Sequence, residues 1–192
     1  MESAMGQISK IFRHLAREFQ IYILSGIIIL LNTLLVDNLF YQSSLLDFII
    51  LKNLQIPFIL VTYILGQLAM GVYYLFFEIT GIDNWCSKRI KCNSKFDSSA
   101  LPKIYVQQSE LYYHFVERYA ILAQMRANFT ASCLINFLVN TIYLFIFKWA
   151  WQVCLASVLS FVGVLIFLIL TCKTDNDYSN RVANIKNQLA IE

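Results

Sequence analysis

The sequence predicts an all-α integral membrane protein: a bundle of four transmembrane helices with an N-terminal amphipathic helix and a cytoplasmic extension of helix three. Composition supports this class, because 58% of the residues are hydrophobic and only 14% are charged, whereas soluble domains carry about 25% charged residues. The apolar residues also gather in four runs, each close to the roughly 20 residues that a helix needs to cross a bilayer core.

The four apolar runs divide the chain into five parts. The predicted spans are Phe19–Val36, Leu54–Phe77, Ala127–Phe147 and Ala150–Cys172. The first run is longer than the apolar region of a signal peptide and no A-x-A-like site follows it, so we interpret it as a span. The predicted parts are an amphipathic helix (1–18), a first transmembrane hairpin (19–77), a cytoplasmic loop and helix (78–126), a second hairpin (127–172) and a cytoplasmic tail (173–192).

The basic residues predict the orientation of these spans. Thirteen of the fifteen Lys and Arg residues lie before the first run, between the second and third runs, or after the fourth run. Only Lys52 and Lys148 lie in the two remaining connections. Since Lys and Arg are enriched in cytoplasmic segments, we expect both termini and the central segment to be cytoplasmic.

The N-terminal segment has the pattern of a helix that lies on a membrane surface. In Met5–Phe19 the apolar residues recur three and four positions apart, and the basic residues avoid that face. Basic amphipathic helices of this kind lie in the interface and are attracted to anionic lipid. The residues predicted to make this contact are Lys10, Phe12, Arg13 and Arg17. A plain cytoplasmic extension of the first span is the alternative.

The central segment predicts a loop followed by a long helix. Gly81–Pro102 is rich in turn-forming and charged residues, which favours a loop. Lys103–Phe129 contains no Gly or Pro, so we expect one helix that continues into the third span. Its aromatic and Arg side chains predict a surface that docks a partner protein, with packing in the headgroup region as the alternative. The candidate docking residues are Tyr105, Tyr112, Phe115, Arg118, Tyr119 and Arg126.

Polar residues form one stripe along the third span. Its members recur every fourth position and therefore share one helix face: Gln124, Asn128, Ser132, Asn136 and Asn140. Such side chains are costly against hydrocarbon and favour another helix or water. Three interpretations are open, namely packing within the chain against Asn32 and Thr33 or Gln67, contact with another subunit, and a water-filled pathway.

The residues that carry chemistry form no catalytic constellation. His114 lies four residues from Glu110 and from Arg118, an arrangement that is more typical of a helix surface than of a metal site. No GxSxG, HExxH or Walker-type glycine loop occurs. We therefore expect no catalytic residue, no metal and no cofactor, and a net charge of +3 predicts no direct contact with nucleic acid. An ion channel or membrane-permeabilising effector is the main alternative, followed by an enzyme acting on lipid.

The layout of the whole chain resembles the small four-span membrane subunits of the KwaA family, which belong to bacterial Kiwa anti-phage defence systems. The residues behind this resemblance are the opening "FRHLAREFQIYILSGIIILLN", the short outer hairpins and the helix "SELYYHFVERYAILAQMRANF". The resemblance implies a non-enzymatic, homo-oligomeric sensor or scaffold in the bacterial inner membrane. It also implies a cytoplasmic partner subunit, which in Kiwa is the DNA-binding KwaB, and it carries over no catalytic residue.

Overall fold

The fold is known from a computed structural model that describes residues 15–40, 55–89, 100–107, 112–146 and 149–189. Within these ranges no strand occurs, which confirms the predicted all-α class. The elements are η1 (Phe19–Ile23), α2 (Leu24–Phe40), α4 (Gln55–Tyr73), η2 (Tyr74–Glu78), α5 (Ile82–Arg89), α6 (Ala100–Gln107), η3 (Tyr112–Glu117), α8 (Arg118–Ile146) and α9 (Trp151–Gln188). The three η elements are turns of π-helix, in which each ring contains one residue more than in an α-helix.

Four helices are long and apolar enough to cross a membrane, as the sequence predicts. They are Leu15–Val36, Pro57–Glu78, Arg118–Ile146 and Trp151–Gln188. The last two extend well beyond the predicted spans, because hydropathy marks only the apolar part of a helix. With 38 residues, α9 is about 57 Å long at 1.5 Å per residue, almost twice a bilayer core of about 30 Å.

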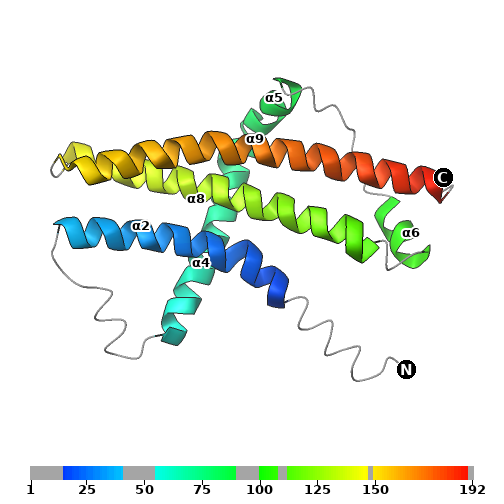
Figure 1. The fold of residues 1–192 in the computed structure, drawn as a ribbon, viewed down its shortest axis with the longest axis horizontal. Coiled ribbons are helices and arrows are strands. Elements are labelled where there is room, and N and C mark those ends of the chain that lie inside the picture. The colour runs from blue at the N-terminus through cyan, green and yellow to red at the C-terminus, as the bar shows by residue number, and fades with distance from the viewer. Residues whose placement is uncertain (1–14, 41–54, 90–99, 108–111, 147–148, 190–192) are drawn as a thin grey trace.

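Three of these helices lie lengthwise beside one another (Figure 1). Helices α2 and α8 are parallel. Asn128 bonds to Ile21 and Asn136 bonds to Ile28, so the residue numbers of the partners rise in the same direction along both helices. Helix α9 returns antiparallel to α8, with which it shares the most extensive contact in the fold. The two pack closely where Gly163 faces Cys133, because a methyl group on Gly163 would lie 2.8 Å from the Cys133 Sγ atom.

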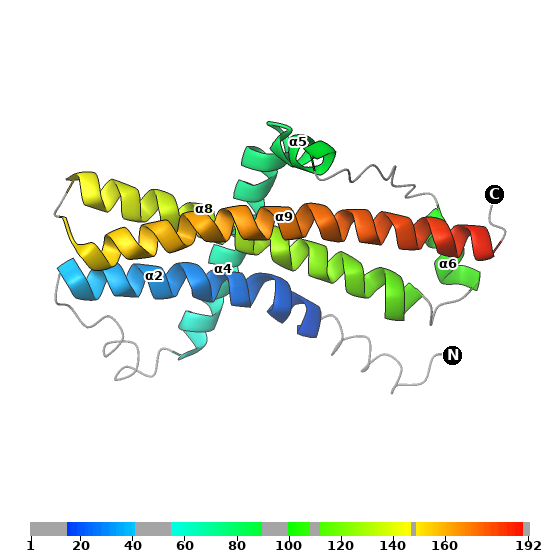
Figure 2. The same ribbon diagram turned by 45° about the horizontal axis from the view of Figure 1, so that its top comes forward.

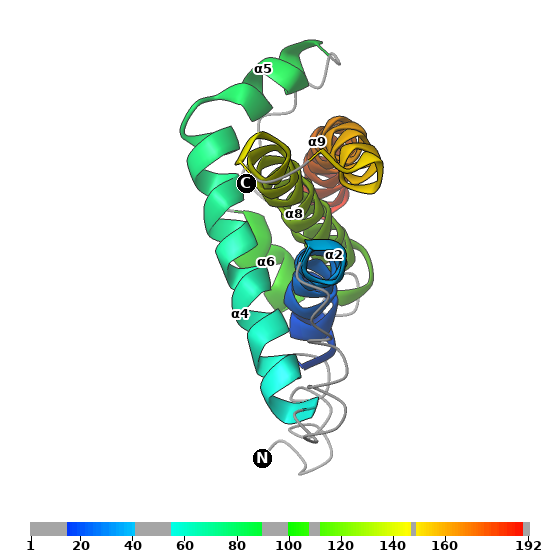
Figure 3. The same cartoon turned by 90° about the vertical axis from the view of Figure 1, so that its left-hand side faces the viewer.

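Helix α4 departs from the predicted arrangement. The sequence predicts four helices side by side, but α4 runs across the other three, which Figure 3 shows end-on. The physical reason is a contact between two backbones. A methyl group on Gly26 would overlap the carbonyl oxygen of Thr62, and one on Gly66 would overlap that of Tyr22. Because neither glycine carries a Cβ, the two backbones can touch where the helices cross at a steep angle. Hydropathy does not predict the angle between two helices.

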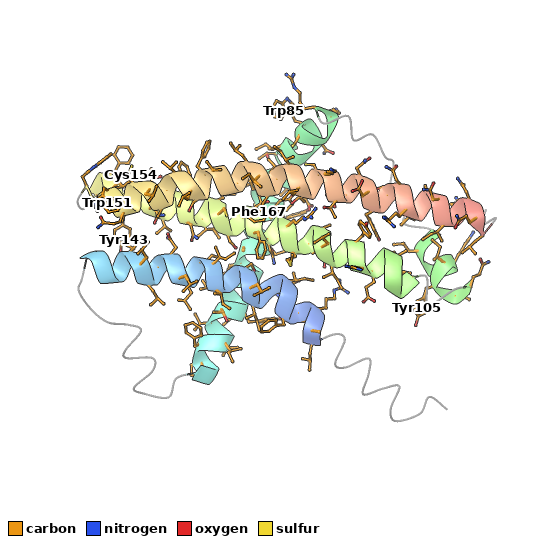
Figure 4. The ribbon with its side chains drawn as sticks, viewed as in Figure 1. Trp85, Tyr105, Tyr143, Trp151, Cys154 and Phe167 are labelled. Carbon is orange, nitrogen blue, oxygen red and sulfur yellow. The ribbon has the colours of Figure 1, made fainter. Side chains whose placement is uncertain are left out.

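The main hydrophobic core lies where the helices cross. Its buried members come from α2, α4, η2, α5, α8 and α9, namely Ile29, Ala69, Tyr73, Phe77, Cys86, Ala127, Ala131, Cys133, Val164, Leu168 and Cys172. Phe167, which Figure 4 labels between the ribbons of α8 and α9, packs edge-on against Phe129 with ring centroids 5.3 Å apart. The four described cysteines, Cys86, Cys133, Cys154 and Cys172, form no disulfide.

A second, smaller core lies at the C-terminal end of α9. It joins Ile104 of α6 and Val116 of η3 to Val182 and Ile185 of α9. Figure 2 shows α6 beside this end of α9. The single helix predicted for Lys103–Phe129 is therefore wrong, since α6 ends at Gln107 and its axis does not continue that of α8. The C-terminal part of α9 continues the same helix and packs over this region, because its apolar residues recur at helical spacing.

The loop predicted for Gly81–Pro102 is also partly wrong. Gly81 has a positive φ of 70°, a conformation that glycine adopts without steric cost and that commonly ends a helix. The chain turns there, and α5 begins at Ile82. Lys88 and Arg89 occupy the last turn of α5, where positive charge is favourable against the helix dipole.

Candidate functional site: a polar seam between the first and third helices

The residues of the predicted stripe all face the first apolar helix, and we call this contact the polar seam. Gln124 accepts a hydrogen bond from Arg17 (3.1 Å). One helical turn further along, Asn128 donates to the Ile21 carbonyl (2.8 Å). The seam therefore begins at the cytoplasmic end predicted for both helices and runs along them in register.

The next two residues of the stripe continue in the same way. Ser132 lies within hydrogen-bonding distance of the Ser25 carbonyl (3.2 Å) and of the Asn128 carbonyl in its own helix (2.9 Å). Asn136 donates to the Ile28 carbonyl (3.2 Å). A backbone carbonyl in a helix has a second lone pair, so these bonds form without breaking the first helix.

The seam ends in a pair of side-chain amides. Asn140 donates to Asn32 and Asn32 donates to Asn140, both at 3.0 Å. Asn140 is fully buried. Because each amide satisfies the other, the pair fixes which residues of the two helices lie opposite each other.

The first helix widens where the seam begins. The π-helical turn η1 covers Phe19–Ile23, and Leu24 donates its N–H to the Phe19 carbonyl. The Ile21 carbonyl in this turn accepts from both Asn128 and Ser25. Asn128 is fully buried, and its Oδ1 atom has no hydrogen-bond partner within the described part of the chain. The seam is thus closely packed but keeps one unused acceptor at its cytoplasmic end.

A second polar contact joins the first helix to α4 beside the glycine crossing. Tyr63 donates its hydroxyl to Glu18 (3.1 Å) and accepts from the side chain of Gln67 (3.1 Å). The ring of Tyr63 also packs edge-on against Tyr22 with centroids 5.7 Å apart. Gln67 therefore contacts this tyrosine pair, and the stripe on α8 contacts α2 and η1.

The docking residues predicted on the cytoplasmic helix do not form one free surface. Tyr112 packs against the small C-terminal core, and Arg181 of α9 lies 4.3 Å above the ring of Tyr119. Arg126 donates to Thr174 and to the Leu170 carbonyl of α9. Only Tyr105 and Arg118 are exposed among the side chains that are described, and the side chain of Phe115 lies outside them. The sequence predicts a separate C-terminal tail from residue 173, whereas in the structure α9 continues to Gln188 and covers this face.

Most of the predicted surface helix cannot be placed, since Lys10, Phe12 and Arg13 lie outside the described residues. Arg17 is described and belongs to the seam through Gln124. Within the described ranges, no group of three His, Cys, Asp or Glu side chains comes close enough to hold a metal ion. The site is therefore a helix-packing contact built from amides, hydroxyls and carbonyls.

No protein family, curated protein sequence or solved structure shows a significant similarity to the chain.

Proposed function

We propose that this chain is a non-enzymatic membrane subunit, a sensor or scaffold that assembles with copies of itself and recruits a cytoplasmic protein. On the resemblance to KwaA subunits, we propose that this role belongs to anti-phage defence at the bacterial inner membrane, with a KwaB-like partner. The observation that carries the proposal is the polar seam. The seam supports a structural rather than a chemical role, because it uses the hydrogen-bonding groups of the stripe to hold two spans of one chain together.

The helix directions support an orientation with both termini in the cytoplasm. Because α2 and α8 are parallel and α9 is antiparallel to α8, the starts of α2 and α8 lie at the same end as the finish of α9. The described basic residues of these helices gather at that end: Arg17, Arg118, Arg126, Lys173, Arg181 and Lys186. Trp149 and Trp151 lie at the opposite end, where interfacial aromatic residues are expected. A reporter that is active only in the cytoplasm, fused after Glu192, should therefore give signal, and signal only from an extracytoplasmic reporter would contradict the orientation.

The seam gives less support to an ion channel formed within one chain. A conducting pathway needs polar groups that face water, whereas Asn128, Ser132, Asn136 and Asn140 are buried against the first helix. Planar-bilayer recordings of the purified protein should show no steady conductance. Conductance that disappears in Asn136→Leu would favour the channel instead.

The partner surface that we propose is centred on α6. Tyr105 is 40% exposed and Val106 is 81% exposed on this short helix, next to the covered face of Tyr112. Aromatic residues such as Tyr105 are enriched at protein interfaces, and the exposed Val106 extends the apolar surface beside it. Tyr112 itself is a poor choice for a test, because its replacement would damage the small core that holds α6 to α9.

The test compares two neighbouring substitutions on α6. Val106→Arg should abolish co-purification of the cytoplasmic partner from membranes in mild detergent, while the size of the membrane assembly is kept. Gln107→Arg is the matched control, because Gln107 is exposed on the same helix and is not part of the apolar surface. Loss of the partner in both variants, or in neither, would contradict docking at α6.

A further inference from the structure

We infer that α5 is an interfacial helix that binds anionic phospholipid headgroups of the cytoplasmic leaflet. The inference rests on the membrane insertion in the proposed function and adds a lipid site that the sequence pattern does not predict. It depends on three properties of α5: its depth along α9, the side chains on its outer face, and their charge.

The depth of α5 follows from its buried face. Cys86 is 7% exposed and belongs to the main core together with Leu168 and Cys172 of α9, and α5 lies directly against α9. At this level the sequence of α9 changes from "VLIFLILTC" to "KTDNDYSNR". That change from apolar to polar residues marks the boundary between hydrocarbon and headgroups, so α5 lies at this boundary.

The outer face of α5 combines apolar and basic side chains. Trp85 is 61% exposed and Ile82 is 40% exposed, and Lys88 and Arg89 are exposed in the last turn. Trp85 lies three positions from Lys88 and four from Arg89, so these three exposed side chains share a helix face, whereas Ile82 lies four positions from Cys86 and closer to the buried side. Arg89 lies over the Trp85 ring at 5.4 Å from its centroid. Figure 4 places Trp85 halfway along the molecule, far from both ends of α9.

These side chains match the headgroup region of an anionic bilayer better than water or hydrocarbon. Trp is preferred at the interface because its ring is apolar and its N–H is polar. Lys and Arg extend their charged ends to lipid phosphates while their stems stay in the apolar layer. Each basic residue near an anionic surface contributes about 1 kcal/mol of attraction. We therefore expect phosphatidylglycerol to be enriched beside α5 relative to phosphatidylcholine.

The test uses the full chain with Trp149→Phe and Trp151→Phe, so that Trp85 is the only tryptophan. The protein is reconstituted into vesicles of phosphatidylcholine and phosphatidylglycerol in which one lipid or the other carries bromine near the headgroup. Brominated phosphatidylglycerol should quench Trp85 fluorescence more strongly than brominated phosphatidylcholine. Adding Lys88→Gln and Arg89→Gln should remove this preference, with a loss on the order of fivefold per charge.

The matched control keeps Trp151 alone. Trp151 is 67% exposed, similar to Trp85 at 61%, but lies at the other end of α9, where Lys148 is the one basic residue near it in the sequence. Its preference for the anionic lipid should be smaller than that of Trp85 and unchanged by Lys88→Gln and Arg89→Gln. Equal quenching of Trp85 by both lipids, or quenching only by iodide in the water, would overturn the lipid site. Failure of the protein to float with the vesicles would instead overturn the membrane insertion on which both proposals depend.

Discussion

The first membrane-spanning helix, Leu15–Val36, contacts α8 and α4 in different ways. Against α8 it forms the polar seam, which extends over four turns from Arg17 to Asn32 and pairs side chains with carbonyls and amides. Against α4 it forms a single crossing, where Gly26 and Gly66 let two backbones touch. The seam fixes direction and register over about four turns, whereas the crossing joins the helices through the two glycine contacts and the tyrosine contacts beside them.

This difference teaches which part of the molecule is able to move. Sliding α8 along the first helix would break every bond of the seam, and an unpaired amide in an apolar interior is costly. Turning α4 about the crossing leaves the bonds of the seam intact, although it moves Ala69, Tyr73 and Phe77 within the main core. We therefore expect α2, α8 and α9 to act as one rigid unit and α4 to change its angle when the surroundings change.

The largest effect should come from filling the crossing. Gly26→Ala places a methyl group against the Thr62 carbonyl, and overpacking of this kind costs roughly 1–3 kcal/mol. Hydrogen exchange followed by mass spectrometry should show faster exchange in α4 and little change in α8. Gly71→Ala is the control, because no atom lies within 4 Å of the added methyl position. Equal effects of the two substitutions would mean that the crossing does not hold α4.

A smaller loss should follow from breaking the end of the seam. Asn140→Leu leaves the Asn32 amide without its partner, and hydrogen bonds within membranes contribute roughly 0.6–2 kcal/mol. Unfolding in mixed micelles should measure this loss. Adding Asn32→Leu should restore part of the stability, since no buried amide is then unpaired. Strictly additive losses would show that the two amides do not interact.

The hydroxyl of Tyr63 should stabilise the contact between α4 and the first helix without affecting the seam. Tyr63→Phe removes the bonds to Glu18 and Gln67 but keeps the ring against Tyr22. We expect a loss of about 0.5–1.5 kcal/mol, visible as faster exchange in α4. Faster exchange in α8 as well would show that the two contacts are coupled.

The smallest effect should be at the cytoplasmic end of the seam. Gln124→Leu removes the acceptor for Arg17, but both side chains are partly exposed and solvent weakens the interaction. We expect a loss below about 1 kcal/mol that shrinks as salt is raised. A loss equal to that of Asn140→Leu would mean that the seam is uniform rather than strongest where it is buried.

The sequence predicts the four apolar helices because hydropathy follows directly from composition, and it predicts that the stripe shares one face because periodicity reports geometry within a helix. Neither hydropathy nor periodicity predicts which residues of a neighbouring helix the stripe contacts. The partner carbonyls of Ile21 and Ile28 belong to apolar residues that nothing in the sequence marks as acceptors. The steep crossing depends on which glycine meets which backbone. Helix α5 is missed because its polar residues resemble a loop, although Gly81 before it and Lys88–Arg89 at its end are typical helix boundaries.

The sequence separation of the seam has a consequence for the order in which the protein assembles. Asn32 and Asn140 are 108 positions apart, so at 5–20 residues per second the ribosome adds the second residue roughly 5–20 s after the first. Gly26 and Thr62, which meet at the crossing, are synthesised within a much shorter interval. The crossing can therefore form first and hold the first helix in place until α8 has been synthesised. When α8 is synthesised, the carbonyl groups of the first helix are already positioned, so the crossing guides the formation of the seam.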